Sequence, residues 1–204
     1  MKLVLVTGMS CSGKTTIAKK LSLMNPEITV VSLDWFYKET QSSTKREDCE
    51  LIDFDHPDAF DWERVHRVLG LLLSGIDVII STMYNFQTLK HEQCEEFMLR
   101  SNNVILFEGI FVAYDSFSRE RADFILFANT PIRECFNRRE RRDVEELGRD
   151  QHEIVYRWET LIVPSYKKYI EPYKKGNGNG KTILINSTTF HAELLTINSN
   201  LIAL

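Results

Sequence analysis

A glycine-rich octapeptide near the N-terminus constrains this chain more than any other feature. Residues 8–15 read Gly-Met-Ser-Cys-Ser-Gly-Lys-Thr, which matches the phosphate-binding loop pattern G-x-x-x-x-G-K-[ST]. The segment Lys2–Val6 before it is an apolar run typical of a strand, and the segment Thr16–Leu21 after it has the apolar spacing of a helix. The sequence therefore predicts a loop that joins a strand to a helix, which is the setting that phosphate binding requires.

The loop supplies several groups that bind phosphate. Gly8 and Gly13 let the backbone curl so that its N–H groups point inward, and the following helix N-terminus adds partial positive charge. We expect Lys14 to reach the β- and γ-phosphates of ATP and the Thr15 hydroxyl to ligate Mg²⁺. The alternative, an ordinary glycine turn before a helix, is disfavoured because strand, glycines, lysine and threonine all agree. The expected nucleotide-binding residues are Gly8, Ser10, Ser12, Gly13, Lys14, Thr15 and Thr16.

The composition fits one globular domain. The chain has 204 residues, of which 43% are hydrophobic and 26% are charged, enough to bury a full core as a single domain over residues 1–204. The net charge of −4 and the pI of 5.8 argue against a nucleic-acid-binding protein, which is usually basic. These values leave room for a small anionic ligand held by a local arginine cluster.

Cysteine usage and hydropathy predict a cytoplasmic protein. Cys11, Cys49, Cys94 and Cys135 show neither a C-x-x-C pair nor a zinc-binding spacing, so we expect reduced thiols. The first predicted strand starts at the N-terminus, so we expect no signal peptide before it. No apolar run approaches the roughly 20 residues of a membrane span. We therefore expect no membrane partner, and the sequence leaves a homo-oligomer open.

Strands and helices alternate along the rest of the chain. Apolar runs predict further strands over Thr29–Leu33, Asp77–Ser81, Val104–Phe107, Phe124–Phe127 and Thr182–Asn186. Helical periodicity covers Asp61–Leu73, Pro131–Glu146, Glu153–Tyr169 with an interruption at Pro164, and a C-terminal segment from Phe190. His91–Leu99 is ambiguous, Gln41–Glu50 is expected to be a loop, and Gly176–Gly180 a linker.

This alternation predicts an α/β fold of the P-loop NTPase type, in which a parallel sheet carries helices on both faces. We expect a five-stranded core, a small lid, and an inserted hairpin near residues 77–100 that helps to form an acceptor pocket. Val104–Phe107 is apolar on both faces, as a central strand of a parallel sheet should be.

Two acids directly follow predicted strands. Glu108 comes after Val104–Phe107, and an acid at such a strand end predicts a Mg²⁺ ligand, direct or through water, against the alternative of an acidic turn residue. Asp34 follows the second strand, where a carboxylate could act as the general base that takes a proton from an alcohol acceptor. The local sequence fits a helix N-cap at Asp34 equally well, so both interpretations stay open.

An arginine cluster forms the third candidate element. Its members are Arg138, Arg139, Arg141, Arg142 and Arg149. Spacings of three and four residues put several of them on one helical face. Arginines on a closing lid stabilise the charge that phosphoryl transfer spreads over oxygen atoms, which predicts such a role for at least one of them. The alternative is a solvated face, with the arginines paired to Glu140, Asp143, Glu145 and Glu146.

Several segments of the chain resemble the uridine kinase family. They are Asp-Trp-Phe-Tyr at 34–37, Phe-Asp-His-Pro-Asp-Ala-Phe-Asp at 54–61, Leu-Phe-Glu-Gly-Ile at 106–110, and the stretch from Arg142-Asp143 to Gly148-Arg149-Asp150. Pro164–Pro172 is also similar, so the resemblance runs from the first strand to about residue 175. It implies ATP- and Mg²⁺-dependent phosphorylation of the 5′-hydroxyl of a small-molecule substrate, a nucleoside.

The same resemblance implies roles for individual residues. Asp34 matches the family's general base, which favours that interpretation over the N-cap, and Arg142 matches a phosphate-contacting arginine. With Lys14 they form the expected catalytic set. The expected substrate-binding residues are Asp55 at a ribose hydroxyl, Tyr84 packed on the base, the lid arginines Arg139 and Arg149, and Arg157. The expected metal ligands are Thr15 and Glu108.

The chain departs from the family at the base-reading positions. Leu89 stands where the family has a histidine, with His91 two residues further on, and Asn85 replaces a family acid. A glutamine that reads the pyrimidine edge aligns with Arg157. Such changes alter specificity more than chemistry, so a nucleoside kinase is expected without its base being fixed. Nicotinamide riboside kinases and other small-molecule P-loop kinases are the alternative, and Asn186–Phe190 is expected to border the adenine.

A nucleotide switch or NTPase motor is the remaining class. A guanine-specific switch would need an Asn-Lys-x-Asp segment, and the chain has neither that segment nor an Asp-x-x-Gly segment. A motor would normally couple to a larger assembly, for which a chain of this length has little room. ADP formation that depends on an added nucleoside would separate a kinase from an NTPase.

Overall fold

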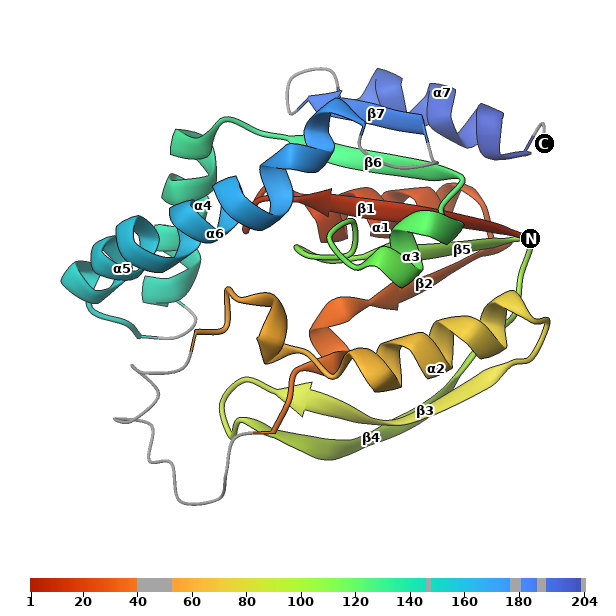
Figure 1. The fold of residues 1–204 in the computed structure, drawn as a ribbon, viewed down its shortest axis with the longest axis horizontal. Coiled ribbons are helices and arrows are strands. Elements are labelled where there is room, and N and C mark those ends of the chain that lie inside the picture. Colours follow the sequence, from red (N-terminus) through yellow and green to blue (C-terminus); the bar gives the residue numbers. More distant parts are fainter. Residues whose placement is uncertain (40–52, 146–147, 177–180, 187–189, 203–204) are drawn as a thin grey trace.

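A five-stranded parallel sheet forms the centre of the molecule (Figure 1). The computed structural model describes residues 1–39, 53–145, 148–176, 181–186 and 190–202. The strands lie in the order β2 (Ile28–Ser32), β5 (Val104–Glu108), β1 (Lys2–Gly8), β6 (Phe124–Asn129) and β7 (Lys181–Asn186). The predicted α/β fold with a five-stranded parallel core is therefore confirmed.

Side chains that alternate along these strands build a core on each face of the sheet. On β5, Ile105 and Phe107 join the cluster that contains α2 (Trp62–Leu73) and the chain around α3 (Ser116–Arg121). Val104 and Leu106 instead pack with α1 (Lys14–Met24) and α7 (Phe190–Ile202). Every residue of β5 is buried, which explains why its sequence is apolar without alternation.

The parallel register brings the carboxyl ends of β1, β2 and β5 to one edge of the sheet. Glu108 pairs with Val6 of β1 and with Ser32 of β2. The phosphate loop follows β1 directly, and α1 begins at Lys14 rather than at Thr16. The predicted acids therefore meet the loop at the edge where ligands bind in open α/β sheets.

A hairpin is inserted between α2 and β5, as the sequence predicts. Its strands are β3 (Val78–Asn85) and β4 (Lys90–Leu99), which pair antiparallel, so the ambiguous segment His91–Leu99 is a strand. The hairpin lies beside α2 (Figure 1). Arg64 of α2 ties them together, because its guanidinium donates to the carbonyl and the hydroxyl of Thr82 at 3.3 and 3.0 Å.

Two helical stretches lie at the phosphate-loop end of the sheet, and the first carries most of the arginines expected in the lid (Figure 1). The first is α4 (Ile132–Glu145). The second stretch, called the arm below, joins α5 (Gln151–Arg157), the π-helical η4 (Trp158–Ile162), α6 (Val163–Ser165), the π-helical η5 (Tyr166–Ile170) and η6 (Glu171–Lys175). The predicted interruption at Pro164 is wrong. Pro164 stands in the first turn of α6, where a missing N–H is tolerated, and π turns flank it.

Some expectations fall outside the described residues. They are the loop Gln41–Glu50, Cys49, Glu146, most of the linker Gly176–Gly180 and the centre of Asn186–Phe190. The other three cysteines are free thiols. Leu33, predicted to end the second strand, instead begins the 3₁₀ helix η1 (Leu33–Phe36). Among the described helices, none has both the length and the apolar character needed to cross a membrane.

Candidate active site

A cavity of about 960 Å³ opens at the edge where β1, β2 and β5 end. Its volume is typical of a site for a small ligand. The phosphate loop, the ends of β2 and β5, the hairpin tip and the arm all contribute side chains to it. The predicted site residues that line it are Ser10, Ser12, Gly13, Lys14, Thr15, Thr16, Asp34, Asp55, Glu108, Arg139, Arg142, Arg149 and Arg157. Gly8 and Tyr84, both in the described part of the chain, are not among its lining residues.

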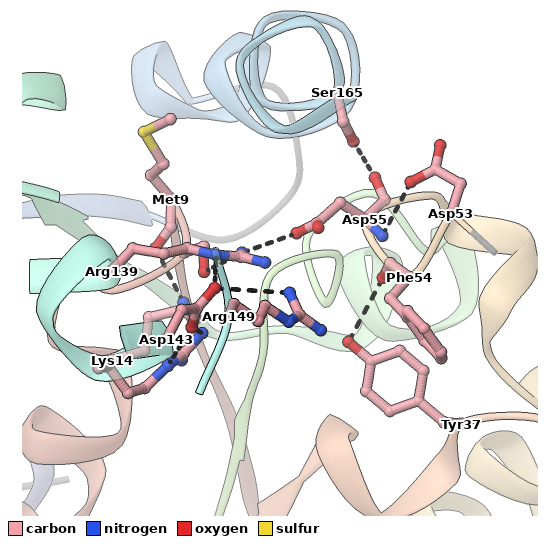
Figure 2. Close-up of polar contacts among 12 residues, drawn as sticks. Met9, Lys14, Tyr37, Asp53, Phe54, Asp55, Arg139, Asp143, Arg149 and Ser165 are labelled. Atoms are coloured by element: carbon pink, nitrogen blue, oxygen red, sulfur yellow. Dashed lines mark hydrogen bonds and ion pairs between the residues drawn. The ribbon is translucent and has the colours of Figure 1, made fainter. Parts of the chain in front are cut away.

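The phosphate loop has the backbone conformation that its sequence requires. Gly8 and Gly13 have φ angles of 146° and 100°, which favour glycine, and a Cβ on Gly8 would lie 2.8 Å from the Ala128 carbonyl oxygen. No side chain caps α1 at Gly13, so the N–H groups of its first turn remain for an anion. The Lys14 ammonium donates to the Met9 carbonyl at 2.9 Å, which folds it across the loop (Figure 2).

Oxygen ligands for a divalent cation meet at the end of β5. The Thr15 hydroxyl donates to Glu108 Oε1 at 3.2 Å, and the Ser32 hydroxyl donates to the same oxygen at 2.9 Å. Burial raises the pKa of Glu108, and the nearby charge of Asp34 adds to the rise. The described residues hold no cluster of three or more His, Cys, Asp or Glu side chains for a metal. The oxygens of Thr15 and Glu108 fit Mg²⁺, which prefers hard oxygen ligands and completes its shell with water and substrate phosphates.

Asp34 opens into the same cavity from η1. The Ser32 hydroxyl caps this helix by accepting the Asp34 N–H at 3.4 Å, so the interpretation of Asp34 as an N-cap is wrong. Asp34 is exposed to solvent, and its carboxylate faces the cavity, whose walls partly enclose it. That partial enclosure raises the pKa of Asp34, although the charges of Lys14 and Arg142 oppose the rise. A carboxylate in this setting is suited to accept a proton.

Arg139 joins the phosphate loop to the far side of the cavity (Figure 2). Its buried guanidinium donates to Ser10 Oγ at 2.9 Å and lies 3.4 Å from Asp55 Oδ1. Burial alone would lower the pKa of Arg139, but the charges of Asp55 and Asp143 outweigh burial and raise it. Arg139 therefore stays charged between the nucleotide loop and Asp55.

A buried carboxylate, Asp143, gathers the arginines of this region (Figure 2). Its Oδ2 accepts from Arg139 Nε at 3.1 Å and lies 3.5 Å from Arg149 Nη1. Its Oδ1 accepts from Arg142 Nη2 and Nε at 2.8 and 3.0 Å. Burial alone would raise the pKa of Asp143, but the arginine charges outweigh it and hold the pKa below its ordinary value.

Asp143 is the central residue that the sequence interpretation missed. It was named in a family-like stretch without a role and in the solvated-face alternative, which is wrong for Asp143 and Arg139, since these residues are 1% and 8% exposed. Arg141 on the same helix is exposed. The four-residue spacing of Arg139 and Asp143 is the signal that could have paired them.

Aromatic rings form another part of the cavity. Tyr37, Phe54 and Phe86 line it. Tyr84 lies behind them, with its ring centroid 5.3 Å from that of Tyr37 and 5.2 Å from that of Phe86. Phe54 and Phe86 were not singled out from the sequence, although both stand in or next to segments that carry the family resemblance.

The two departures from the family pattern, Leu89 and Arg157, also line the cavity. Leu89 has φ 59°, which is unusual for a bulky side chain and marks a constrained hairpin turn. Arg157 is buried. His91 is engaged elsewhere, with Nε2 2.9 Å from the Tyr37 carbonyl oxygen and Nδ1 3.1 Å from Arg64 Nη1. His91 therefore ties the hairpin to the end of η1.

Phe190 is the described residue of Asn186–Phe190 that reaches the cavity. It lines the cavity at the start of α7, and the ammonium of Lys20 lies 4.7 Å from its ring centroid. Asn186 instead bonds to Asn129, whose amide donates to its side-chain oxygen at 2.7 Å. Of the described residues in this segment, Phe190 is thus the one that lines the cavity.

The fold and the loop together define a phosphate-loop protein with a cavity at the carboxyl ends of its central strands. A model of the phosphoribulokinase / uridine kinase family matches residues 3–178. The chain therefore belongs to this family, and the resemblance seen in its sequence motifs is confirmed.

Individual relatives agree with this assignment. The chain is 39% identical over 173 residues to uridine-cytidine kinase B of Dictyostelium discoideum, covering 83% of this chain and 70% of that protein. It is 32% identical over 177 residues to uridine kinase of Ureaplasma urealyticum serovar 10, covering 85% and 84%. D-glycerate 3-kinase from Cryptococcus neoformans shares the fold alone, with a TM-score of 0.64 and 13% identity over 91% of this chain and 86% of that one.

Proposed function

We propose that this protein is an ATP-dependent nucleoside kinase that transfers the γ-phosphoryl group of ATP to the 5′-hydroxyl of a nucleoside. One observation carries the proposal: the phosphate loop and Asp34 open into the same cavity as Asp55 and a set of aromatic rings. Phosphoryl transfer needs donor and acceptor side by side. Membership of the family, and relatives named uridine kinase and uridine-cytidine kinase, support the same conclusion.

The donor side is built for a nucleoside triphosphate. The N–H groups at the start of α1 and the Lys14 ammonium bind the β- and γ-phosphates, for which Lys14 must leave the Met9 carbonyl. Thr15 and Glu108 would hold Mg²⁺, which would neutralise charge on the phosphate oxygens. Arg142 contacts the transferring oxygens in this proposal, which is supported by its position in the cavity lining and by the 41% exposure of its side chain.

Asp34 acts as the general base. The acceptor hydroxyl attacks the γ-phosphorus, the bond between phosphorus and the bridging oxygen breaks, and ADP leaves. The hydroxyl proton moves to the Asp34 carboxylate. The enclosure that raises the pKa of Asp34 makes this carboxylate a better proton acceptor than one in water.

The acceptor side recognises a ribose and a flat base. Asp55 accepts a ribose hydroxyl, Phe54 and Phe86 pack on the base, and Arg149 and Arg157 donate to it. Tyr84 supports this aromatic group from behind. We propose a pyrimidine ribonucleoside as the substrate, in a single cytoplasmic domain over residues 1–204 that has no nucleic-acid or membrane partner.

The test measures ADP formation with MgATP and a panel of ribonucleosides, deoxynucleosides and nicotinamide riboside. Turnover that depends on a nucleoside, and is fastest with a pyrimidine ribonucleoside, is expected. Steady ADP release without an acceptor would instead indicate an NTPase. A selective response to nicotinamide riboside would favour the alternative kinase class, which the names of the relatives do not favour.

A further inference from the structure

We propose that Ser165 and Tyr169, on the arm, position the acceptor-site acid Asp55. The inference rests on the nucleoside kinase activity proposed above. The buried Ser165 hydroxyl donates to the Asp55 carbonyl (Figure 2). One residue further on, His56 Nε2 lies 2.9 Å from the Tyr169 hydroxyl. Two side chains of one helical stretch thus hold two consecutive residues of the acceptor segment.

The direction of the second hydrogen bond follows from the other nitrogen of His56. The Asp58 N–H donates to Nδ1 at 3.2 Å, which caps the short helix η3 (Pro57–Ala59). Nε2 therefore carries the ring hydrogen and donates to the Tyr169 oxygen. Residues 55–59 are held to the arm as one unit, through the backbone at Asp55 and through the imidazole at His56.

The π turns explain how one helical stretch reaches both the cavity and this unit. An α turn takes 3.6 residues, and a π turn, with its i to i+5 hydrogen bonds, takes about one residue more. One turn of each kind spans roughly eight residues, which is the separation of Arg157 and Ser165. In an uninterrupted α-helix the two side chains would point in directions about 80° apart around the helix axis. The π turn η4 therefore brings Arg157 and Ser165 to the same side of the arm.

Packing fixes the side chain of Tyr169. The Tyr169 ring lies edge-on to Phe111, a fully buried residue, at a centroid distance of 6.0 Å, and to Tyr114 at 5.1 Å. The Asp55 N–H donates to Asp53 Oδ1 at 3.0 Å. With both its N–H and its carbonyl bonded, the Asp55 backbone has little freedom, and its carboxylate is presented to the cavity beside Arg139.

This arrangement separates acceptor binding from nucleotide binding. The arm carries Arg157 into the cavity and also holds Asp55, whereas the proposed contacts to ATP and its metal come from the phosphate loop, α4 and β5. Removing the Tyr169 hydroxyl should therefore loosen Asp55 and weaken nucleoside binding without changing ATP binding. A purely structural role would affect both substrates alike.

The experiment compares Tyr169→Phe with the matched control Tyr173→Phe. Tyr173 lies on the same arm, and among the described residues its hydroxyl takes only a long contact of 3.5 Å from Arg119. For each variant, KM for nucleoside and for ATP, kcat, and the equilibrium Kd of the nucleoside are measured. Tyr169→Phe is expected to raise the nucleoside KM and Kd by roughly three- to tenfold, the effect of one lost hydrogen bond. The ATP KM is expected to stay within error, and the control to match the wild type.

Other outcomes overturn the inference. Unchanged nucleoside Kd in Tyr169→Phe, or an equal loss of affinity for both substrates together with a lower melting temperature, would show that the contact does not position Asp55. Ser165→Ala provides a second route to the same answer and should act in the same direction. A wild type that makes no ADP in response to any nucleoside would instead refute the kinase proposal itself, so the two failures are distinguishable.

Discussion

Replacing Asp143 with asparagine tests the arginine network by a nearly isosteric change. Each carboxylate oxygen of Asp143 faces guanidinium nitrogens. Oδ1 faces Arg142, and Oδ2 faces Arg139 and Arg149. An asparagine has one oxygen and one NH₂ group, so in either orientation an amide donor faces a cation. The change therefore removes the negative charge. At residue 143 it also takes the oxygen acceptor away from at least one of the arginines.

The magnitude follows from the burial of the partners. Breaking a buried ion pair costs about 3–5 kcal/mol. Arg142 and Arg149 have side chains 41% and 26% exposed, so they can turn toward water, which puts the expected cost near the lower end, about 3 kcal/mol. For a chain of this length 1 kcal/mol shifts Tm by about 2–4 °C, so Tm should fall by roughly 6–12 °C. We expect kcat to fall by at least about tenfold, because Arg139 and Arg142 lose their positions.

The assay measures thermal unfolding at several pH values between 7 and 3, with circular dichroism as the signal. Because the pKa of Asp143 is lowered in the folded state, its stabilising contribution is complete above the ordinary value of about 3.9 and is lost as pH falls through the lowered pKa. The difference in Tm should therefore shrink at the acid end. Glu63→Gln, which removes the exposed pair with Arg67, is the control and should cost less than about 1 kcal/mol. An Asp143→Asn protein with the Tm of the wild type at pH 7 would refute the reasoning.

Further substitutions test the proposed chemistry. Lys14→Ala should keep the fold and lower kcat by several orders of magnitude, a loss of about 3–4 kcal/mol or more, and near-normal turnover would end the phosphate-loop interpretation. In the wild type, kcat/KM should fall as pH drops through the raised pKa of Asp34, so the acid limb of the pH profile should lie above the usual aspartate range. The Asp34→Asn variant should nearly lose phosphoryl transfer but still bind ATP. Glu108→Gln should shift the Mg²⁺ concentration that activity requires. If Asp34→Asn shows only such a shift and still transfers phosphate, Asp34 is a Mg²⁺ ligand and not the base. The wild type should show a relaxed preference among nucleosides, and Leu89→His should raise kcat/KM for uridine. A wild type that is selective for uridine, with the selectivity lost in His91→Ala, would contradict this prediction.

The sheet could be predicted because its strands are buried on both faces. The apolar run of β5 has no alternation, and residues on either side of the sheet cover it. β4 was ambiguous because half of its side chains are both polar and exposed, so the strand gives no clear period. The π turns were missed because sequence patterns are compared with a period of 3.6 residues, and Pro164 was taken as a break.

The site could be predicted where chemistry fixes the residue type. Lys14, Asp34 and Glu108 follow strands whose ends meet at one edge, so topology alone brings them together. Burial of charged side chains could not be predicted in this way. Arg139 and Arg141 look alike in sequence, and only the packing of α4 buries the first and exposes the second.

The arginine network meets two opposing electrostatic demands. Neighbouring guanidinium groups at about 4 Å repel one another by roughly 4 kcal/mol at a surface-like dielectric. Asp143 offsets this repulsion by accepting from Arg139 and Arg142 and lying close to Arg149. One carboxylate cannot neutralise three cations, but Asp55 lies 3.4 Å from Arg139 and Glu153 lies 3.9 Å from Arg149, so two further carboxylates share this task. The network therefore holds the three side chains at the cavity by pairing their charges. An anionic substrate that enters the cavity competes with these carboxylates for the guanidinium donors.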